Sequence, residues 1–297
     1  MAQHRIVEVM AAAATPISAE GTVDRALYLD HLRRLLARGC DGVVIFGTTG
    51  EGPAFGTAER RAVLDDVIEA GIPAEKLVMA AMSAAAADIH ELCRHAANAG
   101  VHRLLVMPPF FFRGAARPVG LERFYGDLVE GLGDDRIRLL FYHFPEMSGA
   151  AITPDLAMAL RRRFGAVIDG LKDSAGVLDQ TLATIQKLPE LRVLVGTEVH
   201  LPQAVAAGGA GTICGLANVA PEIVRALTTV TDPAEAARLC GRLDALEALF
   251  GAEPFIVALK AVLAIQTGAD LWLTPLPPLS PLNAAAIDRM ATGLQAW

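Results

Sequence analysis

The sequence predicts an α/β protein, a (β/α)8 barrel followed by a C-terminal helical extension, and two observations lead to this prediction. First, short runs of Val, Ile, Leu and Met alternate with longer amphipathic stretches, as expected for parallel strands buried on both faces. Second, there are eight such runs, which suits a closed TIM barrel better than the alternative, an open doubly wound sheet. The expected strands are 7–14, 42–46, 77–81, 103–107, 137–142, 167–171, 192–195 and 211–214.

The intervening stretches carry helix signals. The segments ALYLDHLRRLLARG and TAERRAVLDDVIEAG are amphipathic, and Thr153-Pro154 places an N-cap before a proline at the first helical position. The segment PEIVRALTTVT supplies the last barrel helix, and Asp232 begins a new helix with a capping signature. We therefore expect a catalytic barrel over 1–230 and a helical extension over 231–297, interrupted by the proline-rich turn LTPLPPLSPL.

Composition excludes several classes of protein. The chain has 297 residues, of which 53% are hydrophobic and 20% charged, and its net charge is −7 without a basic block. This disfavours a disordered chain, a nucleic-acid partner and an acidic membrane. The four cysteines lie far apart, and no HxH occurs at a strand end, which disfavours a metal site and a disulfide framework. No run is long enough to span a membrane, and the apolar segment around Glu8 is short and charged, which makes a poor signal-peptide core. The scattered cysteines suit a reducing compartment, so we expect a cytoplasmic protein.

The carboxyl ends of the expected strands hold the reactive side chains. In a (β/α)8 barrel the active site lies at these ends, which here read FGTTGEGP, PPFFF, YHFP, LKDSAG and GTEVH. A lysine, a tyrosine, two threonines and a glutamate are therefore expected to converge on one cavity: Lys172, Tyr142, Thr48, Thr49 and Glu198.

Each of these residues also has a structural interpretation. Lys172 could be a strand-end lysine whose ammonium reaches water, or an amine kept neutral by desolvation and therefore nucleophilic. The loop 47–50 could be an ordinary strand-to-helix turn, or a set of N–H groups and hydroxyls that holds a carboxylate or phosphate. Tyr142 by itself is most often a packed side chain with a satisfied hydroxyl.

Taken together, the motifs resemble the pyruvate-dependent class I aldolase family that contains dihydrodipicolinate synthase and N-acetylneuraminate lyase. The motifs GTTGEGP at 47–53, Y-x-x-P with Gly149, GLKDSAG at 170–176 and GAGTICGLAN at 209–218 occur in the family order, and the resemblance covers essentially the whole chain. It implies that Lys172 forms a Schiff base with a 2-oxo acid, that Tyr142 shuttles protons, and that Thr48 and Thr49 hold the carboxylate, with Thr48 also relaying protons. It also implies no cofactor and a homotetramer or homodimer.

The chain departs from the family pattern at several positions. Met147 stands where the synthases carry an arginine that grips the second substrate, and a thioether cannot replace a bidentate guanidinium. Phe111 stands where many members have a tyrosine that completes a proton relay across a subunit interface. His143 replaces a frequent asparagine, and we interpret it as a packing residue. The residues expected to bind substrate are Gly47, Thr48, Thr49, Gly196, Glu198, Ile213, Met147 and Phe111.

Glu198 is open to two interpretations. An acidic residue here in the sialic-acid lyase branch accepts hydrogen bonds from sugar hydroxyls, and the alternative is a solvated carboxylate at a helix start. The resulting hypothesis is a lyase or aldolase that cleaves or forms a carbon–carbon bond of a 2-oxo acid, with pyruvate as product or donor and an aldehyde as partner. The alternatives are 4-hydroxy-tetrahydrodipicolinate synthase, a dehydratase of a 2-keto-3-deoxy sugar acid, and a non-catalytic protein that binds a 2-oxo acid.

Overall fold

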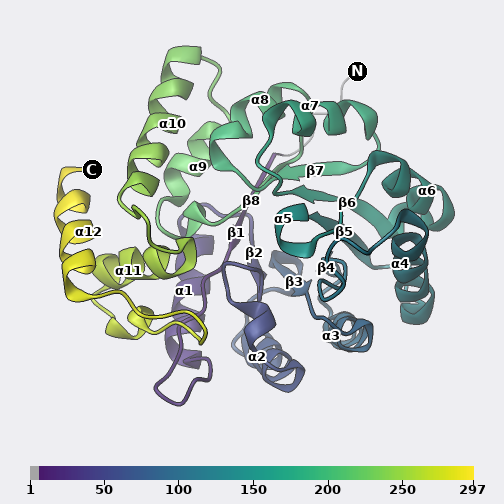
Figure 1. Ribbon diagram of the computed structural model, residues 1–297, viewed down its shortest axis with the longest axis horizontal. Helices are drawn as coiled ribbons and strands as arrows, with labels where there is room; N and C mark the ends of the chain where they lie inside the picture. The colour runs from purple at the N-terminus through teal and green to yellow at the C-terminus, as the bar shows by residue number, and fades with distance from the viewer. Residues whose placement is uncertain (1–6) are drawn as a thin grey trace.

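The computed structural model describes residues 7–297, and its centre is a closed barrel of parallel strands in the order β1-β2-β3-β4-β5-β6-β7-β8 (Figure 1). The predicted barrel is therefore confirmed and the open doubly wound sheet is wrong. The sheet closes because β1 pairs with both β2 and β8. The strands are β1 (Glu8–Ala12), β2 (Gly42–Ile45), β3 (Leu77–Ala81), β4 (Arg103–Val106), β5 (Arg138–His143), β6 (Ile168–Asp173), β7 (Arg192–Val195) and β8 (Gly211–Cys214).

Helices surround the barrel and continue past it. Figure 1 shows the last three helices, in light green to yellow, gathered at one side of the barrel. Within residues 7–297 the α-helices are α1 (Arg25–Ala37), α2 (Thr57–Glu69), α3 (Ala86–Asn98), α4 (Pro118–Leu132), α5 (Pro145–Ser148), α6 (Pro154–Phe164), α7 (Leu178–Lys187), α8 (Leu201–Ala206), α9 (Pro221–Leu227), α10 (Pro233–Ala248), α11 (Phe255–Thr267) and α12 (Ala284–Ala296).

The helix starts follow the expected local chemistry. The Thr153 hydroxyl accepts a hydrogen bond from the Leu156 N–H at 3.3 Å, and Pro154 takes the first position of α6. The Asp232 carboxylate accepts one from the Ala234 N–H at 3.2 Å and so caps α10. The proline-rich segment that follows α11 contains no α-helix before α12 begins. The expected division into a barrel at 1–230 and an extension at 231–297 stays a prediction.

The strands have two buried faces of different character. Side chains such as Val43, Leu104 and Phe141 point outward and join one large core with the surrounding helices. Their neighbours along the strands, including Val44 and Leu105, point into the barrel and form a smaller interior cluster that also contains Tyr142. This alternation places every second strand residue inside the barrel.

Polar contacts between distant segments hold both ends of the barrel. At the amino-terminal end, the Glu8 carboxylate pairs with Arg103 at 2.9 Å and also with Arg192. Burial raises the pKa of Glu8, but the two guanidinium groups outweigh burial, and the net shift is downward. At the other end, the buried Asn218 amide joins the segments after β1 and β8: it donates to the Ala12 carbonyl at 2.8 Å and accepts from the Ala14 N–H at 2.9 Å.

Among residues 7–297, no helix is both long enough and apolar enough to cross a membrane.

Candidate active site

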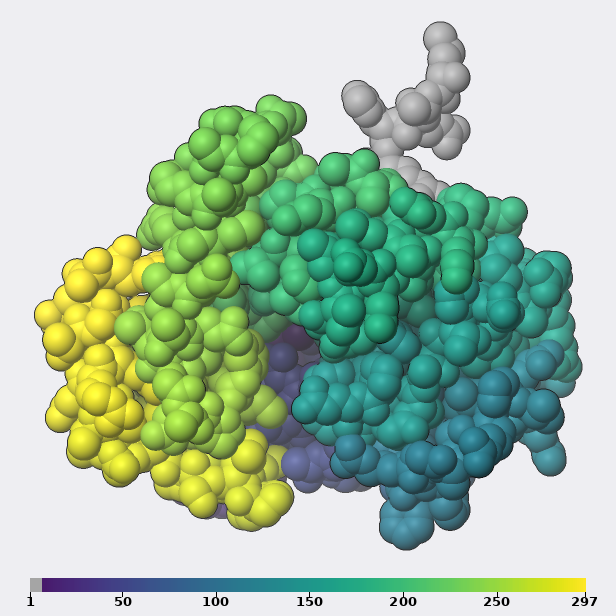
Figure 2. Space-filling model, turned by 45° about the horizontal axis from the view of Figure 1, so that its top comes forward, coloured from purple at the N-terminus to yellow at the C-terminus, as the bar shows by residue number. Residues whose placement is uncertain are grey.

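A cavity of about 370 Å³ opens at the carboxyl ends of the strands. Figure 2 shows the molecule hollowed between the yellow-green C-terminal helices and the teal central segments, with purple and blue N-terminal segments at the floor. Most of the predicted site residues line this cavity, together with residues of α10 and α11 for which the sequence offered no signal. The lining residues are Thr48, Thr49, Tyr142, Phe144, Met147, Lys172, Ser174, Gly196, Thr197, Glu198, Ile213, Cys214, Gly215, Glu247, Phe255 and Ile256.

Three predicted residues form a continuous hydrogen-bonded chain. Lys172 Nζ lies 3.1 Å from Tyr142 Oη, and the same oxygen lies 2.9 Å from Thr48 Oγ1. Lys172 Nζ also lies 4.3 Å from the centre of the Tyr142 ring. The chain links an amine to two hydroxyls that can each donate and accept a proton. It can therefore carry a proton between the amine and the loop that follows β2.

Strand register explains why the amine and the phenol meet. Tyr142 of β5 and Lys172 of β6 are paired positions in the parallel ladder, so their side chains lie on the same face. That face is the barrel interior, because Leu140, two residues before Tyr142, also belongs to the interior cluster. Lys172 is only 4% exposed. The interpretation of Lys172 as a surface lysine is therefore wrong.

The segment after β6 is held by Asp173. One carboxylate oxygen of Asp173 accepts from the Thr181 hydroxyl at 2.8 Å, and the other accepts from the Ala175 N–H at 3.0 Å. The Asp173 carbonyl accepts from the Gly196 N–H at 2.7 Å. A side chain at Gly196 would lie 2.2 Å from the Ser174 hydroxyl, so this position admits only glycine without rearrangement. These contacts give Lys172 a rigid support.

The loop at 47–53 is tightly wound. The Gly47 carbonyl accepts from the N–H groups of both Gly50 and Gly52, at 3.1 and 3.0 Å. Gly47 thus shapes the turn, whereas the Thr48 and Thr49 side chains reach the cavity. A Cβ on Gly52 would lie 1.8 Å from the Phe46 carbonyl oxygen, so the close packing of the loop on itself requires glycine there. Glu51 has a φ of 56°, a left-handed conformation that only surrounding contacts can maintain.

Those contacts come from the C-terminal extension and were not predicted from the sequence. Lys260 of α11 donates to the Glu51 carboxylate at 2.7 Å and to the Thr274 carbonyl at 2.6 Å. The second carboxylate oxygen of Glu51 accepts from the Leu276 N–H at 2.7 Å. Both side chains are almost fully buried, with exposed fractions of 1% for Lys260 and 3% for Glu51. This ion pair connects the loop 47–53, which carries Thr48 and Thr49 and is called the threonine loop below, to the C-terminal extension.

Two carboxyl groups face the cavity, and both have raised pKa values. Burial raises the pKa of Glu198, which is 7% exposed, and its carboxylate accepts from the Leu216 N–H at 2.7 Å. The interpretation of Glu198 as a solvated carboxylate is therefore wrong. Burial and the nearby Asp244 raise the pKa of Glu247 on α10. Burial also raises the pKa of the neighbouring Cys214 thiol well above its usual value, which disfavours a thiolate there.

The remaining predicted residues differ in their positions. Ile213 lines the inner wall of the cavity, and Met147, 45% exposed, lies at its rim. Phe111 is 74% exposed, packs edge-on against Phe112 and lies outside the described lining. The exposed Arg113 donates to the Glu146 carbonyl, next to Met147, and also lies outside the lining.

His143 has a structural rather than a chemical environment. Its Nδ1 accepts a hydrogen bond from the Ile152 N–H at 3.0 Å, which assigns the ring proton of the neutral form to Nε2. Burial lowers the pKa of His143, and the Asp173 carboxylate opposes that shift. These contacts agree with the packing interpretation of His143.

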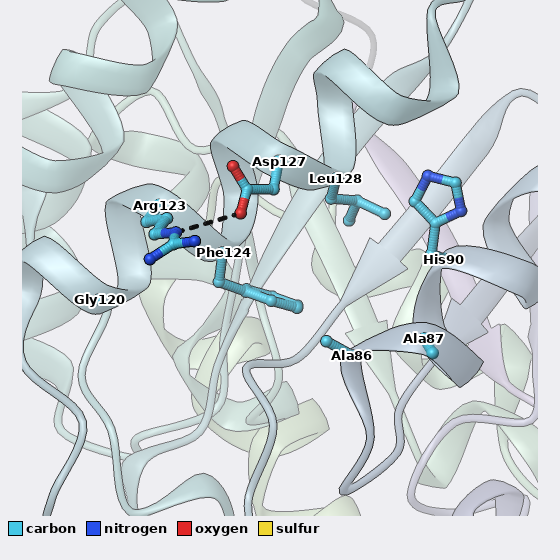
Figure 3. A pocket seen from close by; sticks show the side chains of 8 residues that line it. All are labelled: Ala86, Ala87, His90, Gly120, Arg123, Phe124, Asp127 and Leu128. Atoms are coloured by element: carbon cyan, nitrogen blue, oxygen red, sulfur yellow. Dashed lines mark hydrogen bonds and ion pairs between the residues drawn. The ribbon is translucent and has the colours of Figure 1, made fainter.

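A larger hollow lies outside the barrel and lacks comparable chemistry. It measures about 530 Å³ and lies between α3 and α4, where Arg123 and Asp127 form an exposed ion pair and the Phe124 ring forms one wall (Figure 3). All of its described lining residues belong to α3 and α4, and none belongs to a strand. Among the described residues, no group of three or more His, Cys, Asp or Glu side chains is placed to hold a metal ion.

Comparisons with known proteins place the chain in one family. A sequence model of the dihydrodipicolinate synthetase family matches residues 5–296. The chain is 33% identical, over 94% of both chains, to an uncharacterized DapA-like lyase from Chloroflexus aurantiacus. It is 26% identical to a probable 2-dehydro-3-deoxy-D-pentonate aldolase from Escherichia coli, over 93% of this chain and 92% of that protein.

A solved structure shows the same fold. The crystal structure of dihydrodipicolinate synthase from Agrobacterium tumefaciens superposes with a TM-score of 0.89 at 30% identity, and the match covers 97% of this chain and 98% of that one. The sequence match and the structural match both extend over nearly the whole chain. The protein is therefore a member of the dihydrodipicolinate synthetase family of lyases and aldolases.

Proposed function

We propose that this protein is a Schiff-base lyase or aldolase that joins pyruvate to an aldehyde, or cleaves the resulting 4-hydroxy-2-oxo acid. The observation that carries the proposal is the hydrogen-bonded chain from Lys172 through Tyr142 to Thr48 inside a barrel. A buried amine beside a hydroxyl matches the needs of covalent catalysis at a ketone. The family includes lyases and aldolases, in agreement with this assignment.

In the proposed reaction, the hydrogen-bonded chain from Lys172 through Tyr142 to Thr48 carries protons both to and from the reacting groups. The Lys172 amine attacks the ketone carbon of pyruvate, and loss of one water gives a protonated imine. Loss of a methyl proton then gives an enamine, whose carbon attacks the aldehyde carbon while the aldehyde oxygen takes up a proton. Water hydrolyses the new imine and releases the 4-hydroxy-2-oxo acid with the free amine. Tyr142 lies where it can carry the protons, with Thr48 as its hydrogen-bond partner.

The substrate carboxylate is proposed to bind at Thr48 and Thr49. Both line the cavity beside Lys172, which is the one Lys or Arg among the described lining residues. A carboxylate there would meet hydroxyls and loop N–H groups, which bind anions without a second cation. This contact would hold the ketone next to the amine, an effect of positioning. The proposal requires no cofactor, and it includes a homotetramer or homodimer in the cytoplasm.

Met147 and Glu198 bear on the two alternative reactions. Position 147 holds methionine where the synthases carry arginine, which disfavours 4-hydroxy-tetrahydrodipicolinate synthase, although relatives of 29% and 26% identity carry that name. The buried Glu198 suits a hydroxylated chain, which keeps a dehydratase or aldolase of 2-keto-3-deoxy sugar acids as the second candidate. A non-catalytic binding protein would show no turnover with any aldehyde.

Borohydride trapping tests the proposal. Incubation with pyruvate and borohydride should add one reduced adduct, which mass spectrometry of peptides should locate at Lys172. The Lys172→Ala variant should give no adduct, and Lys172→Arg should also give none because a guanidinium does not lose its proton. An adduct that persists in Lys172→Ala, or the absence of any adduct in the parent, would show that the assignment is wrong.

A further inference from the structure

A second cavity adjoins the proposed active site. It measures about 230 Å³ and shares Thr48, Met147 and Ile256 with the cavity that contains Lys172. We call it the apolar chamber. Thr48 lines the apolar chamber, and its hydroxyl lies 2.9 Å from Oη of Tyr142, the proposed proton carrier. The apolar chamber is therefore adjacent to the proposed catalytic residues.

The walls of the apolar chamber offer almost no polar groups to a ligand. They come from the strand ends, through Met82 and Met107, from Phe110, and from Leu276 and Leu279 of the extension. Among the described lining residues, Thr48 and Glu51 are the two with polar side chains.

Both polar side chains are already engaged. The two carboxylate oxygens of Glu51 accept from Lys260 and from the Leu276 N–H, each at 2.7 Å. The hydroxyl of Thr48 is hydrogen-bonded to Tyr142. A sugar chain in the apolar chamber would lose its hydrogen bonds to water without replacing them, whereas a hydrocarbon would gain from leaving water.

We propose that the apolar chamber receives the hydrocarbon part of the aldehyde, so that the protein accepts alkyl or aryl aldehydes. This inference rests on the function proposed above and specifies its substrate class. The size is sufficient, since apolar cavities of about 150 Å³ hold benzene. Methionine side chains adapt to ligands of irregular shape, and Met82, Met107 and Met147 all line the apolar chamber.

A series of straight-chain aldehydes tests the inference. Propanal, butanal, pentanal and hexanal differ in apolar length but little in the reactivity of the carbonyl group. If each added methylene enters the apolar chamber, kcat/KM for pyruvate consumption should rise about threefold to fourfold per methylene, or about 30- to 60-fold from propanal to hexanal.

Substitutions at Leu279 connect this rise to the apolar chamber. Leu279 is half-buried in the proline-rich segment; it lines the apolar chamber but not the cavity that contains Lys172 and Tyr142. Leu279→Asp should reduce the ratio of kcat/KM for hexanal over propanal to within a few fold of one, whereas the matched control Leu279→Met should keep the rise. Ala54→Phe is a second variant, because Ala54 is exposed and its replacement fills the same space; it too should flatten the series. Circular dichroism and thermal unfolding report whether each variant is folded.

The outcomes separate this inference from the proposed function. A flat series in the parent, with the pyruvate adduct present on Lys172, would overturn the inference and leave the proposed function intact. A rise that Leu279→Asp and Ala54→Phe both leave unchanged would also overturn it, because the gain would then arise elsewhere. If pyruvate gives no adduct on Lys172, the proposed function fails and the inference fails with it.

Discussion

Replacing Lys260 by methionine should strongly destabilise the protein. Methionine retains much of the volume of the lysine stem but removes the charge from the buried pair with Glu51. The Glu51 carboxylate would keep its hydrogen bond from the Leu276 N–H but lose its cation, at a site where its side chain is 3% exposed. A buried carboxylate without a cation is costly because little water can reach it.

The magnitude follows from the distance between the charges. At 2.7 Å and an effective dielectric constant of about 20, Coulomb's law gives about 6 kcal/mol of attraction. Removing the lysine also removes the cost of burying its ammonium, and this burial lowers the pKa of Lys260 while Glu51 opposes the shift. The expected loss in the free energy of unfolding is therefore about 3–5 kcal/mol, the range found when one partner of a buried pair is removed.

Chemical and thermal unfolding measure this loss. At about 2–4 °C per kcal/mol for a large domain, the melting temperature should fall by on the order of 10 °C. The matched control is Lys187→Met, because Lys187 is exposed at the end of α7, and its replacement should change stability by less than about 0.5 kcal/mol. The KM for pyruvate should rise in Lys260→Met, since Glu51 belongs to the loop that carries Thr48.

A double-mutant cycle completes the test. Glu51→Gln combined with Lys260→Met removes both charges, so the double variant should be more stable than the sum of the single losses predicts. A loss below about 1 kcal/mol in Lys260→Met, or additive losses in the cycle, would refute the reasoning that the buried pair secures the threonine loop.

Three further predictions concern single side chains. Tyr142→Phe should remain folded but lower turnover by about 10²–10⁴, the usual contribution of a positioned proton carrier; near-normal turnover would mean that another group or water carries the proton. The parent should have a lower kcat/KM for aspartate semialdehyde than for glyceraldehyde, and Met147→Arg should narrow the difference by pairing with the carboxylate; a parent that prefers aspartate semialdehyde would contradict this. Burial lowers the pKa of His31 to about 4 from an ordinary 6.5, so the unfolded chain binds more protons and stability should fall by about 2 kcal/mol from pH 7 to pH 5. In His31→Gln this part of the pH dependence should disappear, as measured by urea unfolding, and an unchanged pH dependence would exclude His31 as its source.

Local sequence patterns were sufficient to predict the barrel and the centre of the site. Most strands are short apolar runs, and the alternation of side chains along a strand places Tyr142 and Lys172 on one face once β5 and β6 are paired. Because a (β/α)8 barrel brings all carboxyl ends of its strands to one side, residues at the ends of β2, β5 and β6 converge without further information. The resemblance to a family of aldolases added roles to those residues.

Only the tertiary structure decided which distant residues meet. Glu51 and Lys260 are 209 positions apart, and the sequence pattern around either residue does not predict that their side chains form an ion pair. The same holds for Glu247 and Phe255, which the extension brings to the cavity, and for Leu279 in the apolar chamber. The physical reason is that propensity and periodicity act over a few turns of chain, whereas these contacts depend on how the extension docks on the barrel. The sequence by itself determined the barrel and the place of Lys172 at the end of β6, and the docking of the extension determined the shape and polarity of the space around that side chain.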